Sequence, residues 1–392
     1  MFRRSASVRI GLSGTGFIAS GLVRVLSAQP ERYRITGVLT DRPAAEVTPC
    51  FPDLPICQDP EQLLDDCDVV IECSGTVGRA ARLARAAVAR PVPVLTLNAE
   101  FQVTLGAAFA EYGTVVESQG DQPGSLAALH REALLMGFEP LVYGSQKGFL
   151  DPDPDPAEMR RWAARQGISL AATVAFTDGT KVQIEQALVA NGLGAEILCS
   201  GLAGPTSESL IDGAERLARM AEARPAGGAP ISDYVLQPGG RGSVFVVARH
   251  PSDPGHLAYY KMGTGPYHML ERPYHLGHYE VPVSLDQLLS GQRGLLTAGT
   301  EQTQSVGAVA KRDLPSGYRV ARAIGSFDFR GTALRFAEMP DHMPIGLMEA
   351  CVLRRPVTRG QVLTWDDVEL TDGLAAELAA QVYPAPSSVS VM

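Results

Sequence analysis

The sequence lacks the features that define several large classes of proteins. It has no dense basic tract, and its formal net charge is −9 over 392 residues, which argues against nucleic acids and anionic membranes as partners. It has no unbroken run of about 18 apolar residues, so we expect no membrane-spanning helix. Glycines between Gly11 and Gly16 interrupt the stretch after Arg3 and Arg4. We therefore expect no signal peptide and a cytoplasmic protein.

The six cysteines do not form a metal-binding or disulfide pattern. No C-x-x-C pair occurs among them, so we expect neither a zinc ribbon nor a disulfide framework, but reduced and mostly buried thiols. His275 and His278 have H-x-x-H spacing without an obvious third ligand. We expect these histidines to serve structure or the substrate pocket, and no bound metal. The serine-hydrolase motif G-x-S-x-G is also absent.

Lysine is scarce in this chain. Only four of the 34 basic residues are lysines, at positions 147, 181, 261 and 311. Because the chain uses arginine almost everywhere else, each lysine is a candidate for a role that needs an ammonium group rather than a guanidinium.

Short apolar runs alternate with stretches of helical character in the first 143 residues. Such alternation with short connections is typical of a parallel sheet that is covered by helices on both faces. The apolar runs are 8–12, 35–39, 69–73, 92–97, 114–117 and 141–143, and the helical stretches are 17–28, 60–64, 77–89, 105–112 and 125–136.

The sequence therefore predicts an α/β protein whose N-terminal Rossmann domain, a doubly wound parallel sheet, covers residues 1–143. A central α+β region for substrate binding and dimerisation follows at 144–304, with the acidic, proline-rich segment 151–156 as a stiff connector. The dimerisation region leads us to expect a homo-oligomer. Short β-like segments fill 305–372, and the tail 373–392 ends in a Ser- and Pro-rich stretch that we expect to fray.

The first apolar run leads into a nucleotide-binding motif. The segment SGTGFIA at 13–19 gives G-x-G-x-x-A between a strand and a helix. In such a motif Gly14 permits the tight turn, Gly16 lets the backbone approach a pyrophosphate, and Ala19 lets the helix pack close to the sheet. The helix start at Phe17 and Ile18 would supply amides and a positive dipole to the phosphates. With strand, turn, helix and second strand all in place, the pattern indicates NAD or NADP binding.

The end of the second strand carries the residues that would bind the adenine ribose. Asp41 lies about 20 residues beyond the motif, where an acidic side chain binds the ribose 2′-hydroxyl of NAD. Its neighbour Arg42 could instead pair with the 2′-phosphate of NADP. The sequence thus leaves the choice between NAD and NADP open.

Two further loops follow apolar runs and are candidates for the cofactor site. Ser74, Gly75 and Thr76 come directly after the third strand and should pass beside the cofactor, although a simple strand-to-helix loop would look the same. Asn98 follows the fourth strand, where it could bind the nicotinamide carboxamide or substrate, or cap the next helix.

The best constellation for proton transfer lies around Lys181. If a helix begins near Asp178, then Asp178, Lys181 and Glu185 share one face. An Asp N-cap with a surface Lys–Glu pair is the plain alternative. However, Lys181 would lie in the first turn, where the helix dipole disfavours a cation and lowers its pKa. Such a lysine could exchange a proton with an alcohol, with Asp178 and Glu185 orienting it or binding substrate hydroxyls.

Lys147 is the second candidate for the catalytic site. It lies in a glycine-flanked turn just after a strand, where strand ends open onto the active cleft of α/β enzymes. There it could hold a substrate oxygen or carboxylate, or it could be a solvated turn residue.

Several longer motifs accompany these residues. They are DVVIECSG at 68–75, LNAE at 97–100, GDQPG at 120–124, GSQKG at 144–148, FTDGTKVQIEQ at 176–186 and RPYHL at 272–276, with PIGL at 344–347 and RGQVLTWDDVEL at 359–370. In these motifs the chain resembles the homoserine dehydrogenase-like oxidoreductases that carry a C-terminal SAF (antifreeze-like) domain.

The resemblance implies a nicotinamide-dependent oxidation or reduction of a small hydroxyl or carbonyl compound. Because homoserine dehydrogenases have Asn-Gly-Thr where this chain has Gln146–Gly148, homoserine itself is not the expected substrate. An NAD(P)-binding sensor, or a lyase or epimerase with bound NAD, would also fit the same residues.

Overall fold

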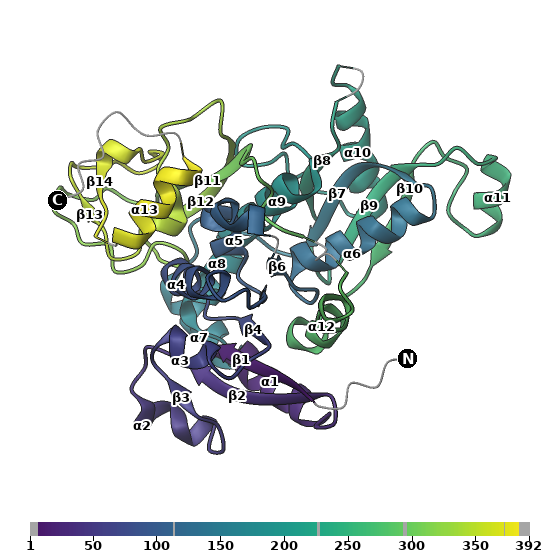
Figure 1. Ribbon diagram of the computed structural model, residues 1–392. Coiled ribbons are helices and arrows are strands. Elements are labelled where there is room, and N and C mark those ends of the chain that lie inside the picture. Colours follow the sequence, from purple (N-terminus) through teal and green to yellow (C-terminus); the bar gives the residue numbers. More distant parts are fainter. Residues whose placement is uncertain (1–6, 113, 226–227, 293–295, 372, 384–392) are drawn as a thin grey trace.

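The N-terminal part of the chain folds around a six-stranded parallel sheet. The structure is a computed structural model that describes residues 7–112, 114–225, 228–292, 296–371 and 373–383 (Figure 1). The strand order is β3-β2-β1-β4-β5-β6, which confirms the predicted doubly wound sheet. The strands are β1 (Val8–Ser13), β2 (Tyr33–Leu39), β3 (Ile56–Cys57), β4 (Val69–Glu72), β5 (Val94–Thr96) and β6 (Val115–Glu117).

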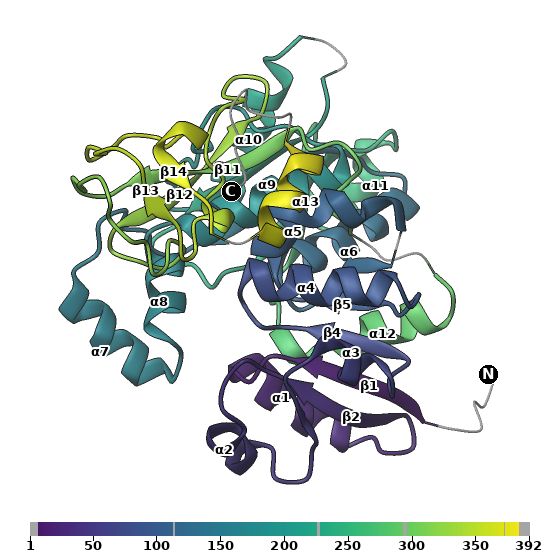
Figure 2. The same cartoon turned by 60° about the vertical axis from the view of Figure 1, so that its left-hand side comes forward.

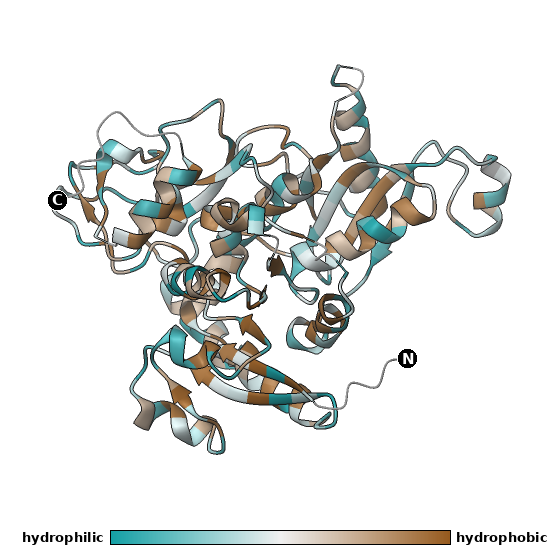
Figure 3. Ribbon diagram, viewed as in Figure 1, coloured by the Kyte–Doolittle hydropathy of each residue, from teal (hydrophilic) through white to brown (hydrophobic). Residues whose placement is uncertain are grey.

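Helices cover both faces of this sheet, and its strands consist largely of buried hydrophobic residues (Figure 3). On one face α1 (Phe17–Ser27) shares a core with α12 (Val281–Leu289), so the chain returns to this sheet long after leaving it. The other face is covered by α3 (Pro60–Leu64), α4 (Val77–Val88) and α5 (Ala99–Leu105). The short element η2 (Gly106–Tyr112) packs in this second layer, whereas α2 (Ala44–Val47) and η1 (Thr48–Cys50) lie by the core on the α1 side.

The central region contains a mixed four-stranded sheet in the order β10-β9-β7-β8. Helix α10 (Leu210–Glu222) packs on one face, and α6 (Gln122–Leu135) and α9 (Thr180–Leu193) pack on the other. The strands are β7 (Glu139–Lys147), β8 (Ile231–Leu236), β9 (Val244–Arg249) and β10 (His268–Arg272). The remaining elements here are α7 (Pro156–Gln166), α8 (Leu170–Thr177), α11 (Pro254–Tyr259) and η3 (Gly277–Tyr279).

The C-terminal module, residues 305–371, is built from small antiparallel sheets and lies against α9 (Figure 2). Its elements are β11 (Gln304–Ala310), β12 (Phe329–Arg335), η4 (Ile345–Leu347), β13 (Val352–Leu353), η5 (Trp365–Asp367) and β14 (Val368–Glu369). The expected tail contains α13 (Gly373–Val382), which packs on α4 and α5. Residues 384–392, where fraying was expected, lie outside the described residues. Among the described residues, no helix combines the length and apolar character that a membrane span needs.

A buried ion pair joins the C-terminal module to the start of α9. The helix begins at Thr180, after Gly179 with its φ of +84°, and not at Asp178 as expected. Asp178 accepts a hydrogen bond from the Thr180 amide at 2.9 Å, and its other oxygen is 2.5 Å from Lys311 Nζ. Both side chains are almost fully buried. The expectation that Asp178 orients Lys181 is therefore wrong in this structure, because its carboxylate is bound by Lys311.

We expect Lys311→Met to lower the free energy of unfolding by about 3–5 kcal/mol, because it leaves the Asp178 carboxylate buried without its cation. Urea unfolding measures the loss, and Asp178→Asn in the same chain should recover part of it. The matched control is Arg359→Gln, which breaks the exposed ion pair with Asp153 and should change stability little. Equal effects of the two single variants would contradict this account of the Lys311 pair.

Candidate active site

The nucleotide motif forms a tight turn between β1 and α1. Gly14 has a φ of +121°, and a Cβ there would lie 2.7 Å from the carbonyl oxygen of Cys73. A side chain at this position would therefore be strained and would also push away the loop after β4. Ala19 is completely buried where α1 meets the sheet. These contacts match the roles that the sequence predicted for both residues.

The start of α1 is open and has unpaired amides. No described atom lies within 4 Å of a Cβ placed on Gly16, and no described side chain caps the helix N-terminus. Phe17, the first helical residue, is exposed, and Ile18 is partly buried against the core of the sheet. The free amides and the helix dipole suit a pyrophosphate in front of this turn.

At the ribose end of the site, Asp41 forms ion pairs with two arginines. The Asp41 carboxylate is 2.6 Å from Arg79 Nε and 3.3 Å from an Arg82 nitrogen, both on α4. Arg42 points to Glu46 at 3.5 Å. The site thus offers both a carboxylate for a ribose hydroxyl and guanidinium groups for a phosphate, so it accommodates NAD or NADP.

The loop after β4 lies beside the glycine turn, and its predicted place beside the coenzyme stays a prediction. The backbone of Cys73 and Ser74 contacts Gly14, and the Ser74 amide donates to Glu72 at 2.8 Å. Gly75, with its φ of +70°, lets the chain turn towards Thr76. The hydroxyl of Thr76 is buried and has no hydrogen-bond partner among the described residues. Such an orphaned group next to the open helix start fits the polar edge of a bound nicotinamide coenzyme.

Asn98 acts as the cap of α5. Its Oδ1 accepts a hydrogen bond from the Phe101 amide at 3.0 Å, and its Nδ2 donates to the Thr76 carbonyl at 3.3 Å. The structure therefore supports the helix-cap interpretation, and the second bond ties α5 to the loop after β4.

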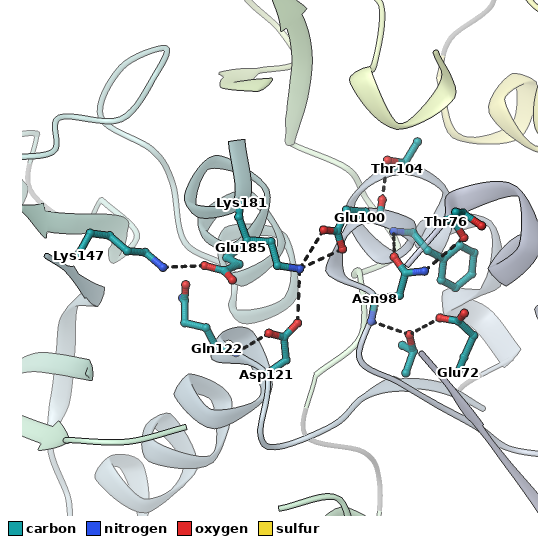
Figure 4. A network of polar contacts seen from close by, with 12 residues as sticks. Glu72, Thr76, Asn98, Glu100, Thr104, Asp121, Gln122, Lys147, Lys181 and Glu185 are labelled. Atoms are coloured by element: carbon teal, nitrogen blue, oxygen red, sulfur yellow. Dashed lines mark hydrogen bonds and ion pairs between the residues drawn. The ribbon is translucent and has the colours of Figure 1, made fainter. Parts of the chain in front are cut away.

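Two lysine–carboxylate pairs lie near the carboxyl edge of the N-terminal six-stranded sheet (Figure 4). Lys181 Nζ is 2.9 and 3.0 Å from the two oxygens of Glu100, and 3.8 Å from Asp121 Oδ2. Lys147, the last residue of β7, is 3.0 Å from Glu185. All five side chains are at most one-fifth exposed. The structure thus brings three of the four predicted catalytic residues together, and it separates Asp178 from them.

The surroundings of Lys181 reverse the predicted direction of its pKa shift. Burial lowers the pKa of Lys181, but Glu100, Asp121 and Glu185 outweigh burial and raise this pKa above its usual value. The expected lowering was wrong because it considered only the dipole of the lysine's own helix. The ammonium is therefore charged at neutral pH in this structure.

Three site residues were missed by sequence reasoning about Lys181. Glu100, Asp121 and Gln122 lie in the LNAE and GDQPG motifs, so the resemblance contained the signal that could have found them. Both amide atoms of Gln122 are buried and have no hydrogen-bond partner in the described part of the chain. Figure 4 draws this carboxamide on the side of the Lys147–Glu185 pair. A buried amide of this kind is suited to a ligand with hydroxyl or carbonyl groups.

His278, on η3, packs against helix α1. The His278 ring lies against α1, where a Cβ on Gly21 would be 2.4 Å from it, and contacts Phe17 at a ring distance of 5.8 Å. Burial lowers the pKa of His278, with a smaller effect of Arg24. Within the described ranges, no group of three or more His, Cys, Asp or Glu side chains could hold a metal ion.

The two motif glycines should respond differently to alanine. Gly16→Ala should keep the fold, because its Cβ meets no described atom, but should weaken coenzyme binding by crowding the pyrophosphate. Gly14→Ala should lose both stability and coenzyme affinity, because of its positive φ and the contact with Cys73. Thermal unfolding and calorimetric titration with NAD and NADP measure the two effects. Normal coenzyme affinity of Gly16→Ala would contradict the assignment.

Comparisons with known proteins agree with this geometry. Residues 14–111 match the family model "Homoserine dehydrogenase, NAD binding domain", and residues 120–281 match "Oxidoreductase DRL, catalytic domain". A comparison with curated proteins gives no match.

Solved structures similar to the chain include three dehydrogenases. A probable dehydrogenase from Thermotoga maritima is 13% identical, with 74% of this chain and 91% of that chain covered and a TM-score of 0.44. A myo-inositol dehydrogenase from Corynebacterium glutamicum is 13% identical, with 73% and 90% covered and a TM-score of 0.45. A UDP-N-acetylglucosamine 3-dehydrogenase from Acidithiobacillus ferrooxidans is 12% identical, with 74% and 92% covered and a TM-score of 0.42. From its two family matches, the chain is an oxidoreductase with a homoserine-dehydrogenase-type NAD-binding domain, and its coenzyme is NAD or NADP.

Proposed function

We propose that the protein transfers a hydride between NAD(P) and a small hydroxyl or carbonyl compound other than homoserine. The observation that carries the proposal is the buried Lys181 ammonium, held at the carboxyl edge of the sheet beside the loops that would bind the nicotinamide. When bound, the coenzyme supplies or accepts the hydride. The protein must then bind the substrate oxygen, stabilise its developing charge and exchange one proton.

Lys181 is suited to bind the reacting oxygen. An ammonium group has three N–H donors, and in this structure Glu100 accepts from Nζ at 2.9 and 3.0 Å while Asp121 is 3.8 Å away, beyond hydrogen-bond distance. The Nζ therefore keeps donor capacity for a substrate oxygen. Its fixed positive charge would stabilise an alkoxide as the hydride moves.

The second pair and Gln122 are suited to hold the rest of the substrate. Lys147 and Glu185 present a donor and an acceptor on the side where Gln122 has two unpaired amide atoms. Together these groups can bind several hydroxyl or carbonyl oxygens of one small molecule. We accordingly propose residues 1–143 as the coenzyme domain and 144–304 as the substrate domain. The assignment of 305–372 as an SAF-like domain, and the homo-oligomer, stay predictions.

The proposed function is tested with purified protein, both reduced coenzymes and a panel of small carbonyl compounds. Loss of the absorbance of reduced nicotinamide, with formation of the corresponding alcohol, is the expected result. Binding of coenzyme without turnover would favour the sensor, and a product with no net change in oxidation state would favour the lyase or epimerase.

Lys181→Met should lower kcat by about 100- to 1000-fold, as for the loss of one transition-state donor, while the dissociation constant of the coenzyme stays unchanged. Lys181→Arg should have a kcat nearly as low as that of Lys181→Met, because the guanidinium is larger and planar. Lys261→Met, which removes an exposed lysine, is the matched control and should keep normal kcat. Near-normal kcat of Lys181→Met would remove Lys181 from the mechanism.

A further inference from the structure

A row of buried polar side chains crosses the N-terminal sheet at its carboxyl edge. In the strand register Ser13 on β1 pairs with Glu72 on β4, Glu72 pairs with Thr96 on β5, and Thr96 pairs with Glu117 on β6. Residues in register on parallel strands point to the same face, about 4.8 Å apart. All four are at most 1% exposed. The row therefore runs on one face of the sheet, from Ser13, just before Gly14, to Glu117, four residues before Asp121.

The two glutamates of this row differ in their hydrogen bonds. Glu72 accepts hydrogen bonds from the Ser74 amide at 2.8 Å and from the Thr96 hydroxyl at 3.2 Å. Both carboxyl oxygens of Glu117 are buried, and neither has a hydrogen-bond partner within the described ranges. An ionised carboxylate in such a place would carry the full cost of its desolvation.

The chain after Glu117 offers no amide to its carboxyl group. The amide of Ser118 donates to the Thr96 carbonyl at 2.8 Å, that of Gln119 to the Ser284 hydroxyl at 2.9 Å, and that of Gly120 to the Ser125 hydroxyl at 3.1 Å. The loop is therefore organised around other acceptors, unlike the loop after β4, whose Ser74 amide returns to Glu72.

The charges that face Glu117 are mostly negative. The negative groups are Asp121 before α6, Glu100 on α5 and Glu72 on β4. The ammonium of Lys181 on α9 acts in the opposite direction. Lys181 is itself bound by Glu100 and lies near Asp121. Burial, and then Asp121, raise the pKa of Glu117 well above its usual value, which Lys181 only partly offsets.

We propose that Glu117 is a proton-carrying acid of the active site, which delivers its proton to the reacting oxygen through Asp121 while Lys181 stays charged. This rests on the proposed function. In carbonyl reduction the hydride from NAD(P)H forms the new C–H bond, and the C=O electron pair moves to oxygen. Glu117 passes its proton to the Asp121 carboxylate, Asp121 passes it to the oxygen to complete the hydroxyl group, and Glu117 then takes one proton from solvent. In alcohol oxidation every transfer runs in reverse.

Two substitutions separate this role from a structural one. Glu117→Gln keeps the size and the neutral polarity of a protonated glutamic acid but has no proton to give. Glu117→Asp keeps an acid but shortens it and leaves a gap. A structural role predicts that the Gln variant is nearly normal and the Asp variant is damaged. The proton-carrying role predicts the opposite order of activities.

We expect Glu117→Gln to lower kcat by about 100-fold or more, as for the loss of a general acid, with coenzyme affinity unchanged. Glu117→Asp should retain more of the activity. The kcat–pH profile of the wild type should show an ionisation well above the usual range for a glutamic acid, and Glu117→Gln should lack it. Normal kcat and an unchanged pH profile in Glu117→Gln would overturn the proposed proton transfer from Glu117, even if the proposed function holds.

Two measurements test the proton on Glu117 without any turnover. The infrared spectrum of the wild type at neutral pH should contain a protonated carboxylic acid band that Glu117→Gln lacks, and the absence of this difference would overturn the proposal. Stability provides the second measurement. A glutamate whose pKa is raised by folding loses its stabilising contribution as the pH rises through that pKa. Glu117→Gln should therefore unfold at a higher temperature than wild type at alkaline pH, and a lower temperature would overturn the proposal.

Failure of the proposed function would look different from failure of this inference. It would appear as a wild-type protein that binds NAD(P)H but reduces no carbonyl compound. That result would rule out the proton transfer from Glu117 together with the proposed function, whatever the infrared spectrum of Glu117 shows.

Discussion

The ammonium of Lys181 among buried carboxyl groups is the interaction on which the rest of the site depends. Glu100 on α5 and Asp121 before α6 would repel each other without this charge. Glu100, Asp121 and Glu185 raise the pKa of Lys181, so the lysine is a positive charge at neutral pH. The proposed mechanism accordingly gives charge stabilisation to Lys181 and proton transfer to a carboxyl group.

Helix α9 connects this charge to the C-terminal module. One side of the helix directs Lys181 and Glu185 into the site, while Thr180 and Gln183 accept hydrogen bonds from the β12 amides of Gly331 and Ala333 at 2.9 and 2.8 Å. The Asp178–Lys311 pair fixes the turn just before the helix. The C-terminal module therefore determines how the first turn of α9 lies, although it is far from the coenzyme motif in sequence. A few tenths of an ångström at this turn would change the donor geometry of Lys181.

The sequence was sufficient for features that depend on neighbouring residues. The strand, glycine turn and helix around Gly14 form within one short segment, and the alternating apolar runs predicted the parallel sheet. Features that depend on distant contacts were not predictable in this way. The pKa of Lys181 depends on Glu100 and Asp121, which lie on other elements, and Asp178 pairs with Lys311. Helix α12 joins the N-terminal core from the far side of the central region for the same reason.

The two glutamates of the sheet row occupy equivalent positions but have different hydrogen bonds. Glu72 and Glu117 are the same residue type, on the same face, in the same register row and equally buried. Their hydrogen bonds differ, since Glu72 accepts from the Ser74 amide in the turn after β4 and from the Thr96 hydroxyl, whereas the amides after β6 bind other oxygens. Hydrogen bonds to a carboxylate favour its ionised form, and their absence favours the acid. Burial raises the pKa of both glutamates, but hydrogen bonds offset part of that rise at Glu72, whereas Glu117 has no such partner among the described residues.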